Sequence, residues 1–311
     1  MKKEIAAFVL VLAVFLLSTP SASWGEHAAC DDVEALRQFE FAEHLFDEED
    51  FFRAIGEYKR FLFLYSEEDN LCEEACFKIA LCYFRAKHWA EAVESLATFI
   101  ERFPDSTKRP EAEYLKGKAE HELGLYEDAL TSFRMVVARD AGELRNKALF
   151  ESALVYVDMR EWEEAGRVLA GITTDSTFHH PAAILSEGLG MIDDLPRKSP
   201  VAAGTMAALL PGAGHVYTGH YRDGLVAFLL NGLFIWAAVE LFDNGDDVAG
   251  GIVTFFELGW YTGNIYSAAG SAHAVNRHSE DSLIQSLKAR SGVSLMRDNN
   301  GSRYLALSIT F

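Results

Sequence analysis

The chain has 311 residues, of which 50% are hydrophobic and 24% are charged. This apolar share is far above that of a disordered chain, and the length gives room for two modest domains. The formal net charge of -19 argues against nucleic acid or an anionic lipid surface as a partner, because both require a basic patch. The surface is expected to be soluble and to favour basic partners.

Residues 1–23 have the pattern of a secretory signal peptide. Lys2 and Lys3 precede an apolar stretch over 5–17, and the small residues Ser21 and Ser23 stand where a signal peptidase reads. An uncleaved anchor is the alternative, although this stretch is shorter than the about 20 residues that span a bilayer. A cleaved signal predicts that the rest of the chain is exported.

Self-similarity dominates residues 33–180. An alanine recurs at intervals of 38, 37 and 36 residues, with an aromatic residue three positions before it and a small residue twelve positions before it. The recurring residues are Ala42, Phe51 and Ala54; Ala80, Trp89 and Ala92; Gly117, Tyr126 and Ala129; and Ala153, Trp162 and Ala165. Small residues are needed where paired helices touch, and the aromatic fills the space between neighbours. The pattern predicts an all-α solenoid of about four helix pairs.

This pattern resembles the tetratricopeptide repeat, a helix-turn-helix unit. The resemblance implies a repeat domain over 33–195 whose extended groove binds a peptide or helix of another protein. A helix over 181–192 is expected to cap the last exposed face. The third copy has Glu120 where an aromatic is usual, and looser packing is expected there. A rigid spacer without a ligand is the alternative function.

The chain has four cysteines, Cys30, Cys72, Cys76 and Cys82. Export would place them in an oxidising compartment, and the pattern leaves open whether Cys30 and Cys72 form a disulfide. Cys76 and Cys82 fall on inward repeat positions and are expected to be packing residues. A zinc site is not expected, because no His or Asp cluster accompanies Cys72 and Cys76. A lipid-modified Cys30 is disfavoured by His27, where leucine is usual.

The composition changes abruptly after the repeats, and charged residues become sparse until Arg277. Two apolar runs, 225–242 and 248–272, each have about the length of a membrane-spanning helix, and 201–210 is a shorter third run. A buried soluble core is the alternative, but two long successive runs rich in glycine and aromatic residues favour the membrane. We predict a transmembrane domain of two or three helices over 198–278.

The stretch PGAGHVYTG, residues 211–219, has the glycine density of a ligand loop. A dinucleotide-binding loop lies between a strand and a helix, whereas a helix-like run precedes this stretch. We therefore expect Pro211, Gly212, Gly214 and Gly219 to end one helix and reverse the chain, with Tyr217 at a membrane interface.

The stretch also resembles the Pro-Gly-x-Gly-x-x-Tyr-x-Gly signature of small membrane hairpin domains in bacterial envelope proteins, which are sometimes joined to helical repeats. The resemblance covers 198–278 and implies membrane placement without catalysis. That family commonly has Gln where this chain has His215, so a role of the amide does not carry over.

Polar and small residues interrupt the apolar runs. Glu257 lies in the middle of a run, with Asn231 and Asn264 as candidate partners, and such an acid indicates either a working site or a protonated structural group. Small residues also recur at every fourth position, over 204–212 and 259–271, and these stripes either pack within the chain or form a homo-oligomer.

The tail, 279–311, ends in a predicted β-hairpin. Asn300 and Gly301 suit a two-residue turn, and alternate residues from Leu305 to Phe311 are apolar. The final Phe resembles the end of an outer-membrane barrel strand, but the sequence lacks the strands that such a barrel needs. A lone hairpin is marginal, so it is expected to dock on helices of the same chain.

The sequence lacks a nucleophile elbow, a metal-protease pair and a Walker loop, so we expect neither enzyme activity nor a cofactor or metal site. It predicts a non-enzymatic scaffold or adaptor of the bacterial cell envelope, with periplasmic repeats and an inner rather than an outer membrane anchor. Expected partners are another envelope protein or peptide and the lipid bilayer. The alternatives are an accessory subunit of a membrane transport or protein-insertion system that uses Glu257, and a soluble two-domain protein.

The position of the carboxyl terminus depends on the short run 201–210. If all three runs cross, Arg222 and Arg277 fall on the cytoplasmic side together with the carboxyl terminus, as the positive-inside rule prefers. If the first run only dips into the bilayer, the carboxyl terminus stays outside.

Overall fold

The computed structural model describes residues 24–65, 69–140, 142–291, 293–297 and 303–307. The predicted signal peptide lies outside these residues. The chain divides into two compact units, Met1–Met159 and Arg160–Phe311, and each is described by itself.

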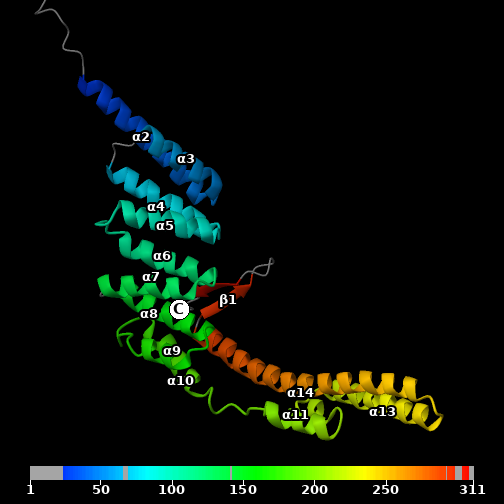
Figure 1. The fold of residues 1–311 in the computed structure, drawn as a ribbon. Coiled ribbons are helices and arrows are strands. Elements are labelled where there is room, and N and C mark those ends of the chain that lie inside the picture. The colour runs from blue at the N-terminus through cyan, green and yellow to red at the C-terminus, as the bar shows by residue number, and fades with distance from the viewer. Residues whose placement is uncertain (1–23, 66–68, 141, 292, 298–302, 308–311) are drawn as a thin grey trace, which may run out of the picture. The chain divides into compact units, whose positions relative to one another are not determined.

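The first unit is a series of antiparallel helices (Figure 1). They are α2 (Trp24–Asp47), α3 (Phe51–Leu64), α4 (Asp69–Arg85), α5 (Trp89–Arg102), α6 (Arg109–Glu122), α7 (Tyr126–Arg139) and α8 (Glu143–Asp158). Each helix contacts the next one along the chain, and α2, α4, α6 and α8 also contact one another in succession. This nearest-neighbour pattern is that of a solenoid, so the prediction of all-α helical repeats is confirmed.

In the first three pairs the recurring residues lie on two helices that contact each other. The predicted alanines are fully buried, and the predicted aromatics Phe51, Trp89, Tyr126 and Trp162 are half-buried. A Cβ atom added at Gly117 would lie 2.8 Å from the ring of Phe133, so the third pair has no room for a larger residue.

A left-handed residue ends the first helix of each pair. Glu49, Lys87, Gly124 and Arg160 have φ angles of 61°, 60°, 75° and 63°, each five residues before the recurring alanine. In the first three pairs the next N–H group reaches back to a carbonyl five residues earlier, over 2.9 Å, which closes the helix end. Only one of the four residues is glycine, so the sequence gives little sign of this shared turn.

The second unit begins with α9 (Trp162–Leu169) and α10 (His179–Gly190) and continues with α11 (Pro200–Leu209), α12 (Ala213–Tyr217), α13 (Tyr221–Asp243) and α14 (Asp247–Arg290). The unit starts earlier than the predicted domain boundary at 195–198 because α10 packs against the end of α14. A Cβ atom at Gly188 would lie 2.1 Å from the Leu287 side chain. The guanidinium of Arg160 binds Glu280 and Asp281, at 2.6 Å each.

Two short strands follow α14. β1 (Val293–Arg297) pairs with β2 (Arg303–Leu307) in antiparallel register, with Leu295 opposite Leu305. β1 also contacts α14. The predicted turn at 300–301 and the last residues of the alternating pattern lie outside the described residues.

Within the described residues, one helix is long and apolar enough to cross a membrane, the 23-residue α13 with a mean hydropathy of 2.1. The predicted two or three spanning helices are therefore not supported by length and composition. The first run forms α11, which has 10 residues. The run 248–272 forms the first part of α14, where Glu257, Thr262 and Asn264 lower the hydropathy.

Candidate functional site

The predicted turn motif forms a tight corner at α12, and its glycines allow the close contacts. Gly212 has a φ of 84°, and a Cβ atom there would lie 2.0 Å from the carbonyl oxygen of Gly224 at the start of α13. A Cβ atom at Gly214 would lie 2.1 Å from the carbonyl oxygen of Ala203 in α11. Gly219, with a φ of 87°, ends α12. Side chains at Gly212 and Gly214 would separate α12 from its neighbours, whereas Gly219 supplies the positive φ alone.

The start of α11 and the end of α12 meet at one point. The N–H group of Ser199 donates to the hydroxyl of Tyr217 at 3.1 Å, and the ammonium of Lys198 lies 4.8 Å from the centre of that ring. The side chain of Asn276 on α14 exchanges two hydrogen bonds, of 2.7 and 2.9 Å, with the backbone of Lys198.

The carboxyl-terminal end of α11 lies closer to the amino-terminal end of α14. The hydroxyl of Tyr261 donates to the carbonyl of Ala208 at 3.0 Å, and Gly204 packs against Ile265. Since Lys198 lies at Asn276, α11 runs antiparallel to α14, and α12 brings the chain back to the level at which α11 began.

Helices α11 to α14 form a bundle (Figure 1). Its interior consists of small and polar residues. The buried positions are Ala203, Ala207, Gly214, His215, Thr218, Gly224, Ala227, Asn231, Ala238, Gly250, Glu257, Asn264, Ala268 and Ala272. Large apolar side chains lie outside, such as Trp236, 62% exposed, and Phe255, 74% exposed. This distribution is the reverse of the one that water-soluble domains adopt.

Three buried polar side chains of the bundle retain atoms without hydrogen bonds in the described structure. Asn231, 0% exposed, donates from Nδ2 to the Ala227 carbonyl at 2.5 Å, but its Oδ1 atom has no partner. Both carboxylate oxygens of Glu257, 7% exposed, also have none. The sequence had suggested Asn231 and Asn264 as partners of this acid, and the described residues show no hydrogen bond from either to it.

Asn264 pairs with His215 instead. Nε2 of His215 lies 3.1 Å from Oδ1 of Asn264, so this nitrogen carries the proton. The other ring nitrogen lies 3.5 Å from the hydroxyl of Ser271. Sequence reasoning missed this pair because the two residues are 49 positions apart and share no periodic pattern.

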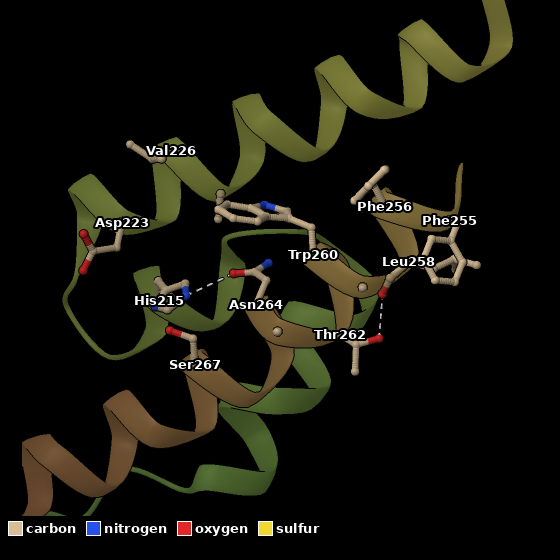
Figure 2. Close-up of a pocket in the computed structure, with 13 residues that line it drawn as sticks. His215, Asp223, Val226, Phe255, Phe256, Leu258, Trp260, Thr262, Asn264 and Ser267 are labelled. Carbon is tan, nitrogen blue, oxygen red and sulfur yellow. Dashed lines mark hydrogen bonds between the residues drawn. The ribbon is translucent and has the colours of Figure 1, made fainter. Parts of the chain in front are cut away.

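A cavity of about 1030 Å³ lies beside this pair, between α13 and α14 (Figure 2). Most of its wall is apolar, and polar side chains gather toward one end. The lining residues are His215, Asp223, Val226, Ala227, Phe255, Phe256, Leu258, Gly259, Trp260, Thr262, Gly263, Asn264 and Ser267. The Nδ2 atom of Asn264 has no hydrogen-bond partner in the described structure and lies beneath the Trp260 ring.

A smaller cavity of about 370 Å³ lies in the repeats, between α3, α4 and α5. Its charged and polar lining residues are Lys59, Tyr83, Glu91, Glu94, Ser95, Thr98 and Arg102. The Lys59 ammonium lies 3.3 Å from the hydroxyl of Tyr83, and Arg102 lies 3.7 Å from the sulfur of Cys76. This mixed lining is suited to a polar peptide, with both signs of charge and a phenol within one groove.

Two buried acids of the repeats, Glu120 and Glu151, have polar partners, although one carboxylate oxygen of Glu151 has none in the described structure. Glu120 binds Lys116 at 2.5 Å and accepts from the hydroxyl of Ser132 at 2.6 Å. Glu151 accepts from the hydroxyl of Tyr114 at 3.0 Å and lies 3.3 Å from Lys118. The loose packing expected at Glu120 is therefore not found, because a polar network takes the place of the aromatic side chain.

Comparison with protein-family models agrees with the geometry of the second helix pair. Residues 74–106 match the tetratricopeptide repeat family model. A crystal structure of a tetratricopeptide repeat protein from Parabacteroides merdae is similar, with 15% identity and a TM-score of 0.44 over 82% of this chain and 98% of that chain. No curated protein matches the chain.

The tetratricopeptide match covers the second helix pair, α4 and α5, which also lines the smaller cavity. The second helix pair is thus similar to a tetratricopeptide repeat. Three cysteines, Cys72, Cys76 and Cys82, lie in α4 of this pair. Burial raises the pKa of the Cys76 thiol, and it raises the pKa of the Cys82 thiol to about 12.

The sequence leaves open a disulfide between Cys30 and Cys72. The thiol of Cys72 donates to the carbonyl of Tyr65 at 3.3 Å. The side chain of Cys30 lies outside the described residues, so a disulfide between Cys30 and Cys72 stays a prediction. Among the described residues, no group of three or more His, Cys, Asp or Glu side chains is placed to hold a metal ion.

Proposed function

We propose that this protein is a non-enzymatic scaffold of the bacterial cell envelope, in which exported tetratricopeptide-type repeats bind another envelope protein and the bundle α11–α14 holds them at a membrane. The reversed distribution of side chains in the bundle carries the membrane part of the proposal. The family match and the helix pairs support the scaffold part.

The exposure of α13 supports the membrane over a soluble core. Only 17% of its most apolar window is buried, although a core helix of a soluble protein is mostly buried. In water each exposed apolar side chain costs free energy, about 25 cal/mol for every Å² left uncovered. In a bilayer the same side chains contact acyl chains, and small residues at the helix contacts allow close packing.

The topology that follows has two crossings. Helix α13 and the first part of α14 cross as a hairpin, with Asn244–Asp246 at the far side. Helices α11 and α12 enter and return, because the hydrogen bond from Ser199 to Tyr217 joins their two ends on one side. Re-entrant backbone is tolerated where protein covers it, as the other helices cover α12. The repeats and the carboxyl-terminal strands then lie on the same side of the membrane.

The amino-terminal leader favours export, and therefore periplasmic repeats and an inner-membrane hairpin. Arg222 and Arg277 then face the periplasm, against the positive-inside rule. The leader is proposed to set the orientation because the first apolar segment usually dominates topology and few basic residues oppose it.

Reporter fusions test this topology. A reporter that is active only in the periplasm, fused after Phe311 and separately at Gly245, should be active at the first position and inactive at the second. Separation of inner and outer membranes should place the chain with the inner membrane. Activity at both positions, or at neither, would contradict the hairpin, and recovery of the mature chain without detergent would contradict membrane placement.

Partner binding is tested at the smaller cavity between α3, α4 and α5, which is called the groove below. A photo-crosslinking amino acid at Thr98, which is exposed and lines the groove, should give one crosslinked species that Glu94→Lys reduces. Thr131 is a matched control, since it is also exposed and its hydroxyl likewise binds the carbonyl four residues earlier, but it lies on α7 outside the groove. Equal crosslinking at both positions would argue for a spacer without a specific groove.

A second candidate function is an accessory role in membrane transport or protein insertion. The two carboxylate oxygens of Glu257 without hydrogen-bond partners in the described structure favour it. Glu257→Gln should leave a scaffold active in cells and should inactivate a device that moves protons.

A further inference from the structure

We propose that the cavity between α13 and α14 holds the acyl chain of one zwitterionic bilayer lipid, whose ester carbonyl accepts a hydrogen bond from the Asn264 amide and whose ammonium group faces Asp223. This inference rests on the proposed membrane placement. It adds a specific lipid site to a bundle that otherwise only anchors the chain.

The two stripes of small residues differ in what covers them. In the first stripe, Gly204 of α11 packs against Ile265 and Ala269, and Gly212, directly before α12, packs against Gly224. In α14, a Cβ atom added at Gly259 or Gly263 would meet nothing within 4 Å. The second stripe thus lines an open cavity that the described residues of the chain do not fill.

The cavity has an apolar and a polar end (Figure 2). Phe255, Phe256 and Leu258 lie at one end, and His215, Asp223 and Ser267 lie at the other. Its volume of about 1030 Å³ is at the upper end of the range for small-ligand sites, roughly 300–1000 Å³. An amphiphile with a long apolar portion and a polar head matches this shape.

Asn264 supplies the second, independent observation. Its side chain is more than nine-tenths buried, its Oδ1 atom is occupied by His215, and its Nδ2 atom has no partner in the described structure. A polar N–H group without an acceptor is costly in a hydrocarbon environment, by several kcal/mol per group. A ligand that offers a carbonyl oxygen at this point removes the cost.

A lipid meets these requirements better than other occupants. A second transmembrane helix would cover the glycines, but its backbone carbonyls already accept hydrogen bonds within that helix. A lipid carries its ester carbonyl directly beside its acyl chain, so one molecule supplies both contacts. Asp223 lies at the polar end and is exposed, which favours an ammonium head group and disfavours a purely anionic one.

Native mass spectrometry of the full-length chain tests the site. The chain is extracted in mild detergent and incubated with dioleoyl phosphatidylethanolamine, or with dioleoyl phosphatidylglycerol as the anionic comparison. One phosphatidylethanolamine per chain is expected to bind, at least about fivefold more tightly than phosphatidylglycerol.

Two leucine substitutions make a matched pair. Gly263→Leu fills the cavity and should weaken lipid binding about tenfold or more. Gly232→Leu should leave binding unchanged, because Gly232 also has nothing within 4 Å but does not line the cavity. Asn264→Leu keeps the apolar wall and removes the donor, so it should weaken phosphatidylethanolamine binding about fivefold.

Four outcomes would overturn the site. Unsaturable lipid adducts that are equal in all variants would mean that only the general apolar surface is coated. A dimer that Gly263→Leu converts to a monomer would assign the cavity to a second copy. Absence of the chain from membranes would remove both the site and the proposed function, whereas a membrane-bound chain without a retained lipid would remove the site alone.

Discussion

The repeats and the bundle bury opposite kinds of side chain. The largest fully buried residues of the repeats are aromatic, with Tyr58, Phe61, Phe99 and Phe133 among them. The bundle buries alanine, glycine and amides, and it exposes its aromatic residues. In water, burial of apolar surface drives folding, so large residues lie inside. In lipid that drive is absent between helices, and close backbone contact and hydrogen bonds replace it.

Buried charges differ between the two regions in the same way. Glu120 and Glu151 of the repeats each contact a lysine. Glu257 of the bundle contacts no basic side chain in the described structure, and its oxygens have no hydrogen-bond partner there. A buried acid without a partner is disfavoured in a structural core and more often belongs to a working site.

Truncation of one aromatic residue in each region should give the largest contrast. Phe133→Ala should lower the free energy of unfolding of the repeats by about 3–5 kcal/mol, because the ring is fully buried against Gly117. Phe228→Ala, on the outer face of α13, should change the stability of the detergent-solubilised chain by less than about 0.5 kcal/mol. Urea denaturation followed by circular dichroism measures both. Equal losses would mean that Phe228 lies in a core.

Enlargement of a buried small residue should destabilise the bundle, where loss of an exposed aromatic side chain does not. Gly214→Ala should destabilise the bundle by about 1–3 kcal/mol, because its Cβ atom would lie within 3 Å of both Ala203 and Ala268. Gly232→Ala is the control, since open space surrounds that position. Limited proteolysis of the detergent-solubilised chain measures the difference. A bundle that tolerates both substitutions equally would not be closely packed at α12.

The left-handed turns provide a comparison among the repeats. Gly124→Ala should destabilise the chain by about 1 kcal/mol, because its φ of 75° strains a residue with a Cβ atom. Lys87→Gly at the equivalent turn should be nearly neutral or slightly stabilising, since relief of strain opposes the greater freedom of the unfolded chain. Thermal unfolding resolves the two signs, and a loss for both would show that the Lys87 side chain matters more than its backbone.

The smallest effect is a pH dependence in the third repeat. Burial raises the pKa of the Glu122 carboxyl above its unfolded value, so the folded chain holds this proton to higher pH. That contribution favours folding below the unfolded pKa and is lost as pH rises through the folded pKa. Glu122→Gln should therefore stabilise the chain more at pH 7 than at pH 4.

Glu91 serves as a control for Glu122, because the pKa of its carboxyl is shifted in the opposite direction. Backbone and His88 hydrogen bonds lower the pKa of this exposed carboxyl, so its contribution is present above the unfolded pKa and is lost as pH falls. Glu91→Gln should therefore give the reverse trend in urea denaturation at the two pH values. The same sign for both variants would refute the role given to burial at Glu122.

Much of the repeat fold could be predicted because its information is local. Each small residue and aromatic needed for one helix pair lies within 38 residues, and the recurrence exposes them. The shared left-handed turn could not be predicted, since Glu49, Lys87 and Arg160 give no compositional sign of a positive φ. The surrounding helix-end hydrogen bonds hold them in that conformation.

The bundle could be predicted only in outline. Its apolar runs and turn motif are visible in the sequence, but only α13 has the length and composition of a span among the described residues, because polar residues of α14 weaken the second run. The partner of Asn264 was missed because His215 approaches it only when α12 folds back against α14.

The sequence by itself determined the helical repeats, the abrupt change of composition and the corner at the glycine motif, because period, hydropathy and backbone freedom are properties of neighbouring residues. Tertiary structure decided which glycine stripe is covered, which polar atoms lack partners and where α11 returns. Those outcomes depend on contacts between separate helices, such as the hydrogen bond from Tyr261 to Ala208, and no local pattern encodes them.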